Sequence, residues 1–183
     1  MKLIADYHTH TSYSHGTGTV EENVRAAKRR KLTVVGIADH GPANLFGVGV
    51  KKLSDFLQIK ADVFVARRQN PGIRILVGAE ANVISTEGDI DIPEEILEHL
   101  DYLLVGLHPM VKPARLPDLW HLTLSNFAGK VFPGWNVKNR YYNTRALVKA
   151  VQRYPVLAVT HPGYRLDIDT RDLAVVCAQR GTA

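Results

Sequence analysis

Histidine and glutamate side chains recur directly after short apolar runs that have the composition of buried β-strands. Two histidines follow the first run, LIADY, and single ligand-type residues follow the later runs. The full set of candidate metal ligands is His8, His10, His15, His40, Glu80, His108 and His161. Imidazole and carboxylate groups without thiolate suit Zn, Mn or Fe. The pattern therefore predicts a metal centre at the ends of several strands.

The spacing within the set indicates what such a centre would do. His8 and His10 are two residues apart, so in an extended chain they point the same way, about 6.6 Å apart along the strand. Glu80 has two carboxylate oxygens and can bridge two ions, which then share a water, lower its pKa and clamp the oxygens of an in-line displacement. Metal-assisted hydrolysis is the chemistry that this set serves best.

Two aspartates stand beside candidate ligands, Asp6 in DYH and Asp39 in DH. A ligating histidine usually donates its second ring N–H to a carboxylate or a carbonyl. We expect Asp6 and Asp39 to take this role, with simple packing at a strand end as the alternative. His99 and His121 do not follow a predicted strand, and we interpret them as surface or packing residues.

Short β-branched runs alternate with helical spacing along the chain, which is typical of βα units around a parallel sheet. The expected strands are Leu3–Tyr7, Thr33–Ala38, Ile73–Ala79, Tyr102–Leu107 and Val156–Thr160. The expected helices are Thr19–Lys31, Lys51–Arg68, Pro93–Leu100, Asn139–Tyr154 and Thr170–Arg180, the last followed by Gly181. The ligands would then meet at the C-terminal ends of the strands, where β/α barrels carry their active sites.

Residues 112–138 interrupt this rhythm with three prolines, two glycines and four Trp or Phe residues. One interpretation is a lid over the site, because functional residues are common in long connections. The other is an insertion whose aromatic side chains pack on the outside of the barrel. The sequence leaves both open.

The length bears on how complete the barrel is. Closed β/α barrels typically take about 250 residues, whereas this chain has 183, with two residues after Gly181. We therefore expect a single domain over residues 1–183 that lacks its C-terminal strands. An open sheet leaves an unpaired edge, so we expect either a longer barrel or an edge covered by a partner chain in a homo-oligomer.

Composition limits the class of protein. Hydrophobic residues make up 45% and charged residues 22% of the chain, as in ordinary soluble globular domains. The single cysteine, Cys177, excludes a disulfide framework and a thiolate metal cluster. The N-terminal apolar run is too short for a signal peptide, and no run reaches membrane-spanning length. We expect a cytoplasmic protein without a membrane partner.

The net charge is +5, which permits a nucleic-acid partner. The densest basic cluster, residues 28–31, ends an expected helix, where cations offset the helix dipole. That placement explains the cluster without a nucleic-acid partner, and we expect none. Bound metal cations would add positive charge and favour an anionic substrate.

Five motifs occur in the order that is typical of the PHP (polymerase and histidinol phosphatase) family, which the chain resembles over essentially its whole length. They are DYHTHTS (6–12), ADHGP (38–42), GAEAN (78–82), GLH (106–108) and THPG (160–163). The ADHGP and EAN forms look most similar to the small stand-alone bacterial phosphatases of the family. The resemblance implies an α/β fold, a distorted (β/α)7-type barrel, of which about five βα units are expected here.

The resemblance also implies which ligands share an ion. His8, His10 and Glu80 would hold one, Glu80, His108 and His161 a second, and His15 and His40 a third. Two to three Zn, Mn or Fe ions would occupy a complete site. The nucleophile would be a metal-bridging hydroxide, so no side-chain nucleophile is expected. The family adds two ligands from a late Asp-x-His motif that this sequence does not reach.

These expectations favour a metal-dependent phosphoesterase that hydrolyses a small phosphomonoester. Arg165, next to Tyr164, could bind the phosphate, since guanidinium groups fork onto phosphate oxygens; pairing on the surface is the alternative. A phosphodiesterase or nuclease acting on nucleic acid ranks lower, because no continuous basic groove with interleaved aromatics is visible. An inactive fragment that binds metal weakly or not at all is the third possibility.

Overall fold

The computed structural model describes residues 3–183, so Met1 and Lys2 of the expected domain 1–183 lie outside the described residues. The strands are β1 (Ala5–Thr9), β2 (Val34–Ile37), β3 (Arg74–Asn82), β4 (Tyr102–Gly106) and β5 (Val156–Val159). The main helices are α1 (Val20–Arg29), α2 (Asp55–Gln69), α3 (Glu94–Leu97), α6 (Asn136–Arg153) and α7 (Thr170–Arg180). Between β4 and α6 come α4 (Leu116–Asp118), the π-helix η1 (Leu119–Leu124), α5 (Ser125–Val131) and the 3₁₀ turn η2 (Pro133–Trp135).

Within residues 3–183 the five strands form one sheet in the order β1-β2-β3-β4-β5. β1 pairs parallel with β2, and β2 pairs parallel with β3. Each strand is followed by helical structure, as the sequence predicts for βα units. The fold class is therefore α/β, and the elements match part of a β/α barrel.

The first strand lies further along the chain than expected. Leu3 and Ile4 are largely exposed, and the parallel register instead joins Ala5 with Val34 and Thr9 with Ile37. The expectation of a strand over Leu3–Tyr7 was therefore shifted by two residues. The physical reason is that pairing with β2, more than local hydrophobicity, decides where β1 begins and ends. As a result His8 lies inside β1 instead of after it.

Local capping explains where the helices begin. Thr19 accepts a hydrogen bond from the Glu22 backbone, and the Glu22 side chain accepts from the Thr19 backbone, so the predicted capping box is present at α1. Asp169 accepts from the backbone N–H groups of Arg171 and Asp172 at α7. α7 ends where the sequence predicts, and Gly181 follows it with a φ of +68°, a left-handed conformation that glycine adopts without strain.

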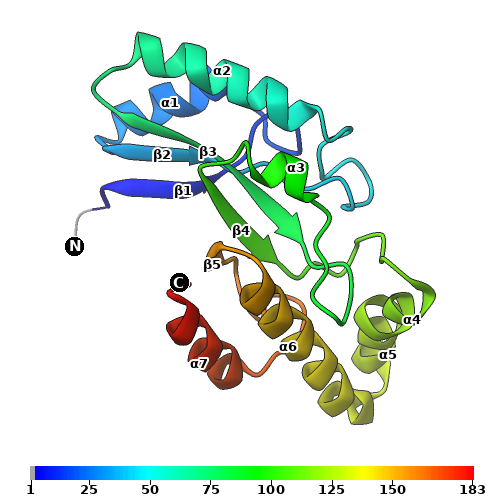
Figure 1. The fold of residues 1–183 in the computed structure, drawn as a ribbon. Helices are drawn as coiled ribbons and strands as arrows, with labels where there is room; N and C mark the ends of the chain where they lie inside the picture. The colour runs from blue at the N-terminus through cyan, green and yellow to red at the C-terminus, as the bar shows by residue number, and fades with distance from the viewer. Residues whose placement is uncertain (1–2) are drawn as a thin grey trace. The chain divides into compact units, whose positions relative to one another are not determined.

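The described chain divides into two compact units. The first comprises the described part of Met1–Pro42, with Phe46–Glu80 and Ile92–Leu103. In this unit α1 and α2 cover one face of β1, β2 and β3 (Figure 1). Its core consists of apolar side chains from α1, α2, β2 and β3, which include Val24, Val35, Ile37, Phe56, Ile59, Val63 and Val77. This core fixes the strands whose ends carry the first candidate ligands.

The second unit comprises Ala43–Leu45, Ala81–Asp91 and Leu104–Ala183. Residues 112–138, expected as a lid or an insertion, form α4, η1, α5 and η2 and part of α6, and they belong to this unit. Asn126 of α5 and Asn143 of α6 exchange two buried amide hydrogen bonds of 3.0 and 2.9 Å. Asn139 donates a further bond of 2.7 Å to the Ser125 carbonyl. The segment 112–138 is therefore packed on α6 through buried polar contacts, and its role as a lid or an insertion stays a prediction.

The end of the described chain runs beside β5. Ala183 donates a backbone hydrogen bond to Leu157 and accepts one from Val159, both of 2.9 Å. Bonds to two positions flanking one residue are the pattern of a parallel strand pair. The edge of β5 that the sequence suggests is open is therefore partly paired by this segment. Among the described residues, no helix is long and apolar enough to cross a membrane.

Candidate metal centre

Glu80 is the central carboxylate of the candidate site in the first unit, and its side chain is fully buried. The Glu80 backbone N–H donates to the Asp39 carbonyl, and the Glu80 carbonyl accepts from the Gly41 N–H. Both hydrogen bonds are 3.0 Å long. These bonds set Glu80 beside His40 in an isolated parallel bridge. The sequence analysis expected the strand to end at Ala79. That boundary was wrong, because β3 continues to Asn82 and carries Glu80 within it.

Three histidine rings converge on one oxygen of this carboxylate. Glu80 Oε2 lies 2.8 Å from His8 Nε2, 3.2 Å from His40 Nδ1 and 3.5 Å from His10 Nε2. His8 comes from β1, His10 follows β1, and His40 follows β2, so adjacent parallel strands deliver all three. A buried carboxylate ringed by imidazoles is the donor set that first-row divalent metals prefer.

His15 joins the same cluster from the loop after β1. Its ring centroid lies 4.5 Å from that of His10 and 5.1 Å from that of His40. The His10 and His40 rings are stacked, 4.6 Å apart and inclined by 9°. In each of two groups, His8–His10–Glu80 and His10–His15–His40, the ligand atoms lie within 4.8 Å of one another. Either group could hold a metal ion.

The loop that carries His15 is tied to the end of β2 by a buried carboxylate. Asp39 Oδ1 accepts from the Thr11 N–H at 2.7 Å and from Ser14 Oγ at 2.5 Å, and Asp39 Oδ2 accepts from Thr11 Oγ1 at 2.7 Å. Asp39 thus positions the chain between His10 and His15. Asp6 accepts from the backbone N–H of His8 at 3.0 Å. A hydrogen bond from either aspartate to a ligating ring stays a prediction.

Two further contacts hold His10. Asn23, on α1, donates through Nδ2 to the His10 carbonyl over 2.9 Å. Gly16 lies so close to the His10 backbone that a Cβ there would sit 2.5 Å from its carbonyl carbon and oxygen. The loop can fold back with His15 only because residue 16 is glycine. The sequence analysis did not identify Thr11, Ser14 or Asn23, since polar residues near a turn carry no distinctive signal.

The protonation of the histidines bears on whether the set fits a metal. Burial lowers the pKa of His10 to about 4, so its ring is neutral, as a metal ligand must be. The His10 Nδ1 atom is buried and has no hydrogen-bond partner among the described residues. The hydrogen bond to Glu80 raises the pKa of His8. A neutral ring with an unpaired buried nitrogen beside a buried carboxylate fits a divalent cation.

A tyrosine supports the strands beneath this cluster. The Tyr102 hydroxyl donates to the Tyr7 carbonyl at 2.6 Å, one residue before His8. Its ring lies over Gly36 of β2 and Gly78 of β3, where a Cβ on either residue would collide with it. Tyr102 is thus the close neighbour that requires glycine at both positions. Burial raises the pKa of Tyr102, so its hydroxyl stays protonated as the donor.

The second unit contains the two remaining candidate ligands. His108 follows β4 and His161 follows β5, and their ring centroids lie 5.2 Å apart. His161 has a φ of +30°, a conformation rare for a residue with a side chain. Strained backbone of this kind concentrates at functional sites. His108 and His161, like His10, His15 and His40 of the first unit, therefore follow strands, whereas His8 and Glu80 lie within β1 and β3.

Arg165 and Tyr164 are exposed in the loop after His161. The Arg165 guanidinium lies over the Tyr164 ring, 5.0 Å from its centroid, and the Tyr164 ring centroid is 5.8 Å from that of His161. The stacked guanidinium keeps its N–H donors available to an anion. The site contacts of Arg165 stay a prediction.

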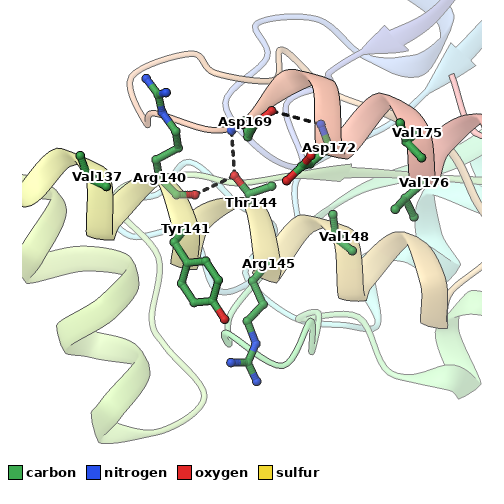
Figure 2. A pocket seen from close by; sticks show the side chains of 10 residues that line it. All are labelled: Val137, Arg140, Tyr141, Thr144, Arg145, Val148, Asp169, Asp172, Val175 and Val176. Atoms are coloured by element: carbon green, nitrogen blue, oxygen red, sulfur yellow. Dashed lines mark hydrogen bonds between the residues drawn. The ribbon is translucent and has the colours of Figure 1, made fainter.

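A cavity of about 580 Å³ in the second unit lies between α6 and α7. Figure 2 shows Tyr141, Arg145 and Val148 on α6 and Val175 and Val176 on α7. Thr144 links the two helices by accepting a bond of 2.8 Å from the Asp169 N–H. None of the candidate metal ligands lines this cavity.

Comparison with known families gives a match to the PHP domain over residues 6–164. A probable phosphatase of Thermoanaerobacter sp. (strain X514) is 31% identical over 173 residues, which cover 92% of this chain and 59% of that protein. A probable phosphatase of Caldanaerobacter subterraneus is 32% identical over 173 residues. The match covers 92% of this chain and 57% of that protein. The chain therefore spans about three fifths of the curated relatives that it matches.

A solved structure has a similar fold. It is the histidinol phosphate phosphatase from Lactococcus lactis, complexed with zinc, L-histidinol and phosphate. The TM-score is 0.57 at 13% sequence identity, and the match covers 98% of this chain and 71% of that one. At this identity the likeness concerns the fold, and it agrees with the partial β/α barrel described above.

Proposed function

This chain belongs to the PHP domain family, and on that premise we propose that it is a metal-dependent phosphoesterase that hydrolyses small phosphomonoesters. The observation that carries the proposal is the convergence of His8, His10 and His40 on the buried Glu80 carboxylate. Relatives named as probable phosphatases support the reaction class. The Lactococcus lactis enzyme of similar fold was crystallised with zinc, L-histidinol and phosphate, which supports a metal ion and a phosphorylated substrate in the proposed reaction.

We assign the metal ligands as the seven residues that follow or end the strands. In this proposal His8, His10 and Glu80 hold one ion, and His15 and His40 contribute to another. The family resemblance adds His108 and His161, which would hold a further ion together with Glu80. Two or three Zn, Mn or Fe ions would occupy a complete site, because neutral imidazoles and carboxylates suit these metals.

When bound, the metal ions would supply the Lewis acidity that lowers the pKa of a water nucleophile and offsets charge on the phosphate oxygens. The protein's own part is to bind and orient. Glu80 and the surrounding histidines would hold the ions, and Asp39 holds the loop between His10 and His15 in place. Arg165 is proposed to bind a phosphate oxygen of the substrate. No side chain is assigned as a nucleophile.

The proposed substrate is a small phosphorylated molecule, and the proposed location is the cytoplasm, in line with the single cysteine of the chain. A homo-oligomer would provide cover for the sheet edge.

The proposal is tested by steady-state hydrolysis of p-nitrophenyl phosphate after loading with Zn, Mn or Fe. Glu80→Gln should reduce kcat/KM by at least a thousandfold, about 4 kcal/mol, because it weakens binding of more than one ion. Glu98→Gln is the matched control, since Glu98 is exposed on the surface after α3 and lies outside the candidate ligand set.

Two results would contradict the proposal. A metal-loaded chain that hydrolyses no phosphomonoester would show that this polypeptide is an inactive fragment. Equal activity in Glu80→Gln and the unchanged chain would show that the hydrolysis takes place elsewhere.

A further inference from the structure

A second, smaller cavity of about 300 Å³ lies in the insertion, apart from the candidate ligands. Its walls come from η1, η2 and α6 and include Trp120, His121, Trp135, Lys138, Asn139 and Tyr142. The volume is at the lower end of the range for small-molecule sites, which suits one or two fused rings. All of these residues belong to the second unit.

The cavity walls are aromatic. The Trp120 and Trp135 rings meet edge to face, with centroids 5.6 Å apart. The His121 and Tyr142 rings are tilted by 30° against each other, with centroids 3.9 Å apart. Both tryptophans nevertheless remain more than 40% exposed. Aromatic faces pack most favourably against another planar ring, so this arrangement offers a slot for one.

The floor of the cavity is rigid and polar. Ser125 and Asn139 are buried, and Asn139 Nδ2 donates to the Ser125 carbonyl at 2.7 Å. Ser125 Oγ in turn donates to the His121 carbonyl at 2.9 Å. These bonds fix the floor before any ligand arrives, which reduces the entropy lost on binding.

The charge at the cavity is positive. Lys138 is exposed at its rim, and the residues that line it include no aspartate or glutamate. Lys130 on α5 instead lies over Phe127, 5.0 Å from its ring centroid, and does not line the cavity. A cationic ligand would be repelled by Lys138, whereas an anionic group would be attracted to it.

Two of the aromatic residues that line the cavity belong to a helix of unusual backbone geometry. Trp120 and His121 belong to the π-helix η1, a geometry that is rare and often found at functional sites. The Thr123 hydroxyl on the same helix is buried without a hydrogen-bond partner among the described residues. A regular α-helix would point Trp120 and His121 in other directions, so the π-helix is what sets the walls of the cavity.

We propose that this cavity binds a small planar aromatic molecule that carries one anionic group, with the ring between Trp120, Trp135 and Tyr142 and the anion at Lys138. An aromatic carboxylate and a nucleoside monophosphate share this chemistry. The inference does not rest on the proposed phosphatase activity, because it concerns residues outside the metal centre and requires no turnover.

The chain provides its own reporter, since its two tryptophans both line this cavity. The chain is titrated with benzoate and with adenosine monophosphate, and tryptophan emission is recorded. Benzamide and adenosine are the uncharged counterparts of the two probes. Each titration is repeated with excess inorganic phosphate, which occupies phosphate-binding groups without offering a ring.

We expect a saturable change in emission with at least one anionic probe, unaffected by inorganic phosphate. The uncharged counterpart should bind about two- to fivefold more weakly, as an exposed ion pair allows. Lys138→Ala should reduce the affinity for the anionic probe to that for its neutral counterpart. Tyr142→Ala should reduce the affinity for both probes. The matched controls, Lys130→Ala and Tyr141→Ala, should leave the affinities unchanged. Tighter binding of adenosine monophosphate than of benzoate would identify a nucleotide as the ligand class, and the reverse a carboxylate.

Three results would overturn the inference. No saturable change with either anion would show that the tryptophans only pack against each other. Equal affinity for charged and uncharged probes would remove the role of Lys138. Displacement of the probe by inorganic phosphate would show that the ring is not what is recognised. Lys138 and Lys130 are both exposed, so their variants are expected to fold, and circular dichroism checks this.

Discussion

The Tyr102 hydroxyl donates a hydrogen bond of 2.6 Å to the backbone carbonyl of Tyr7, the residue before His8. The donor comes from β4 and the acceptor from β1, while the tyrosine ring lies over the glycines of β2 and β3 between them. One side chain thus ties together the strands that deliver the candidate ligands. The position of β1, and with it the place of His8 in the candidate metal centre, depends on this contact.

This contact predicts that Gly78→Ala is destabilising. The added Cβ would collide with the Tyr102 ring, and overpacking of a core costs about 1–3 kcal/mol. Urea unfolding measures the free energy. Gly72→Ala is the matched control, because a Cβ at Gly72 meets nothing within 4 Å. Tyr102→Phe, which keeps the ring, should cost about 1 kcal/mol through the unpaired Tyr7 carbonyl. Equal stability of the two alanine variants would contradict the packing described here.

A second prediction concerns the loop that carries His15. Asp39→Ala removes a buried carboxylate that accepts three hydrogen bonds from Thr11 and Ser14. We expect a loss of about 2–4 kcal/mol in stability, because charged hydrogen bonds contribute more than neutral ones, together with fewer metal ions per chain. Asp55→Ala is the control, since Asp55 accepts exposed hydrogen bonds from the Lys51 and Lys52 backbone at the start of α2, outside this loop. Unchanged metal content in Asp39→Ala would refute the positioning role.

A third prediction concerns substrate binding by Arg165. If Arg165 binds the phosphate group, Arg165→Ala should lower kcat/KM by about 10- to 100-fold, as for loss of a charged hydrogen bond. Metal content should not change, because Arg165 is outside the ligand set. Arg171→Ala, an exposed arginine at the start of α7, is the control. Matching kinetics for the two variants would place Arg165 at the surface without a role in binding.

A fourth prediction is a dependence of stability on pH. Hydrogen bonds from Ser85 and then Arg153 hold the pKa of Asp89 below its ordinary value of 3.8. A depressed pKa in the folded state favours the charged carboxylate, so the stabilisation is present above the ordinary value and is lost as pH falls through the folded one. Asp89→Asn should therefore reduce the unfolding free energy at pH 7, by no more than about 1 kcal/mol because the ion pair is partly exposed. The difference from the unchanged chain should disappear in acid. A difference that grows as the pH falls would reverse the assigned sign.

The sequence predicted the α/β class and the ligand-bearing positions because both depend on local patterns. Apolar runs followed by His or Glu show where strands end, and the capping box at Thr19 and the glycine after α7 mark helix ends. The boundaries of β1 and β3 were less predictable. They depend on pairing between strands, which placed His8 and Glu80 inside strands instead of after them.

Other features depend on contacts that a single sequence does not specify. The three prolines of residues 112–138 suggest irregular chain, yet the segment is mostly helical, since Asn126, Asn139 and Asn143 supply buried hydrogen bonds across it. The role of Asp39 as the anchor of a loop was also not visible from its place beside His40. Long-range polar contacts of this kind appear only once the chain is folded.

The central claim is that the histidines and Glu80 hold metal, and metal content tests it most directly. The protein is purified without added metal or chelator, and Zn, Mn and Fe per chain are counted by elemental mass spectrometry. We predict more than one ion per chain, a large loss in the double variant His8→Ala with His10→Ala, and no loss in His99→Ala, whose ring contacts Lys60 at the surface. A chain that carries no metal, or a double variant that keeps its full complement, would contradict the account.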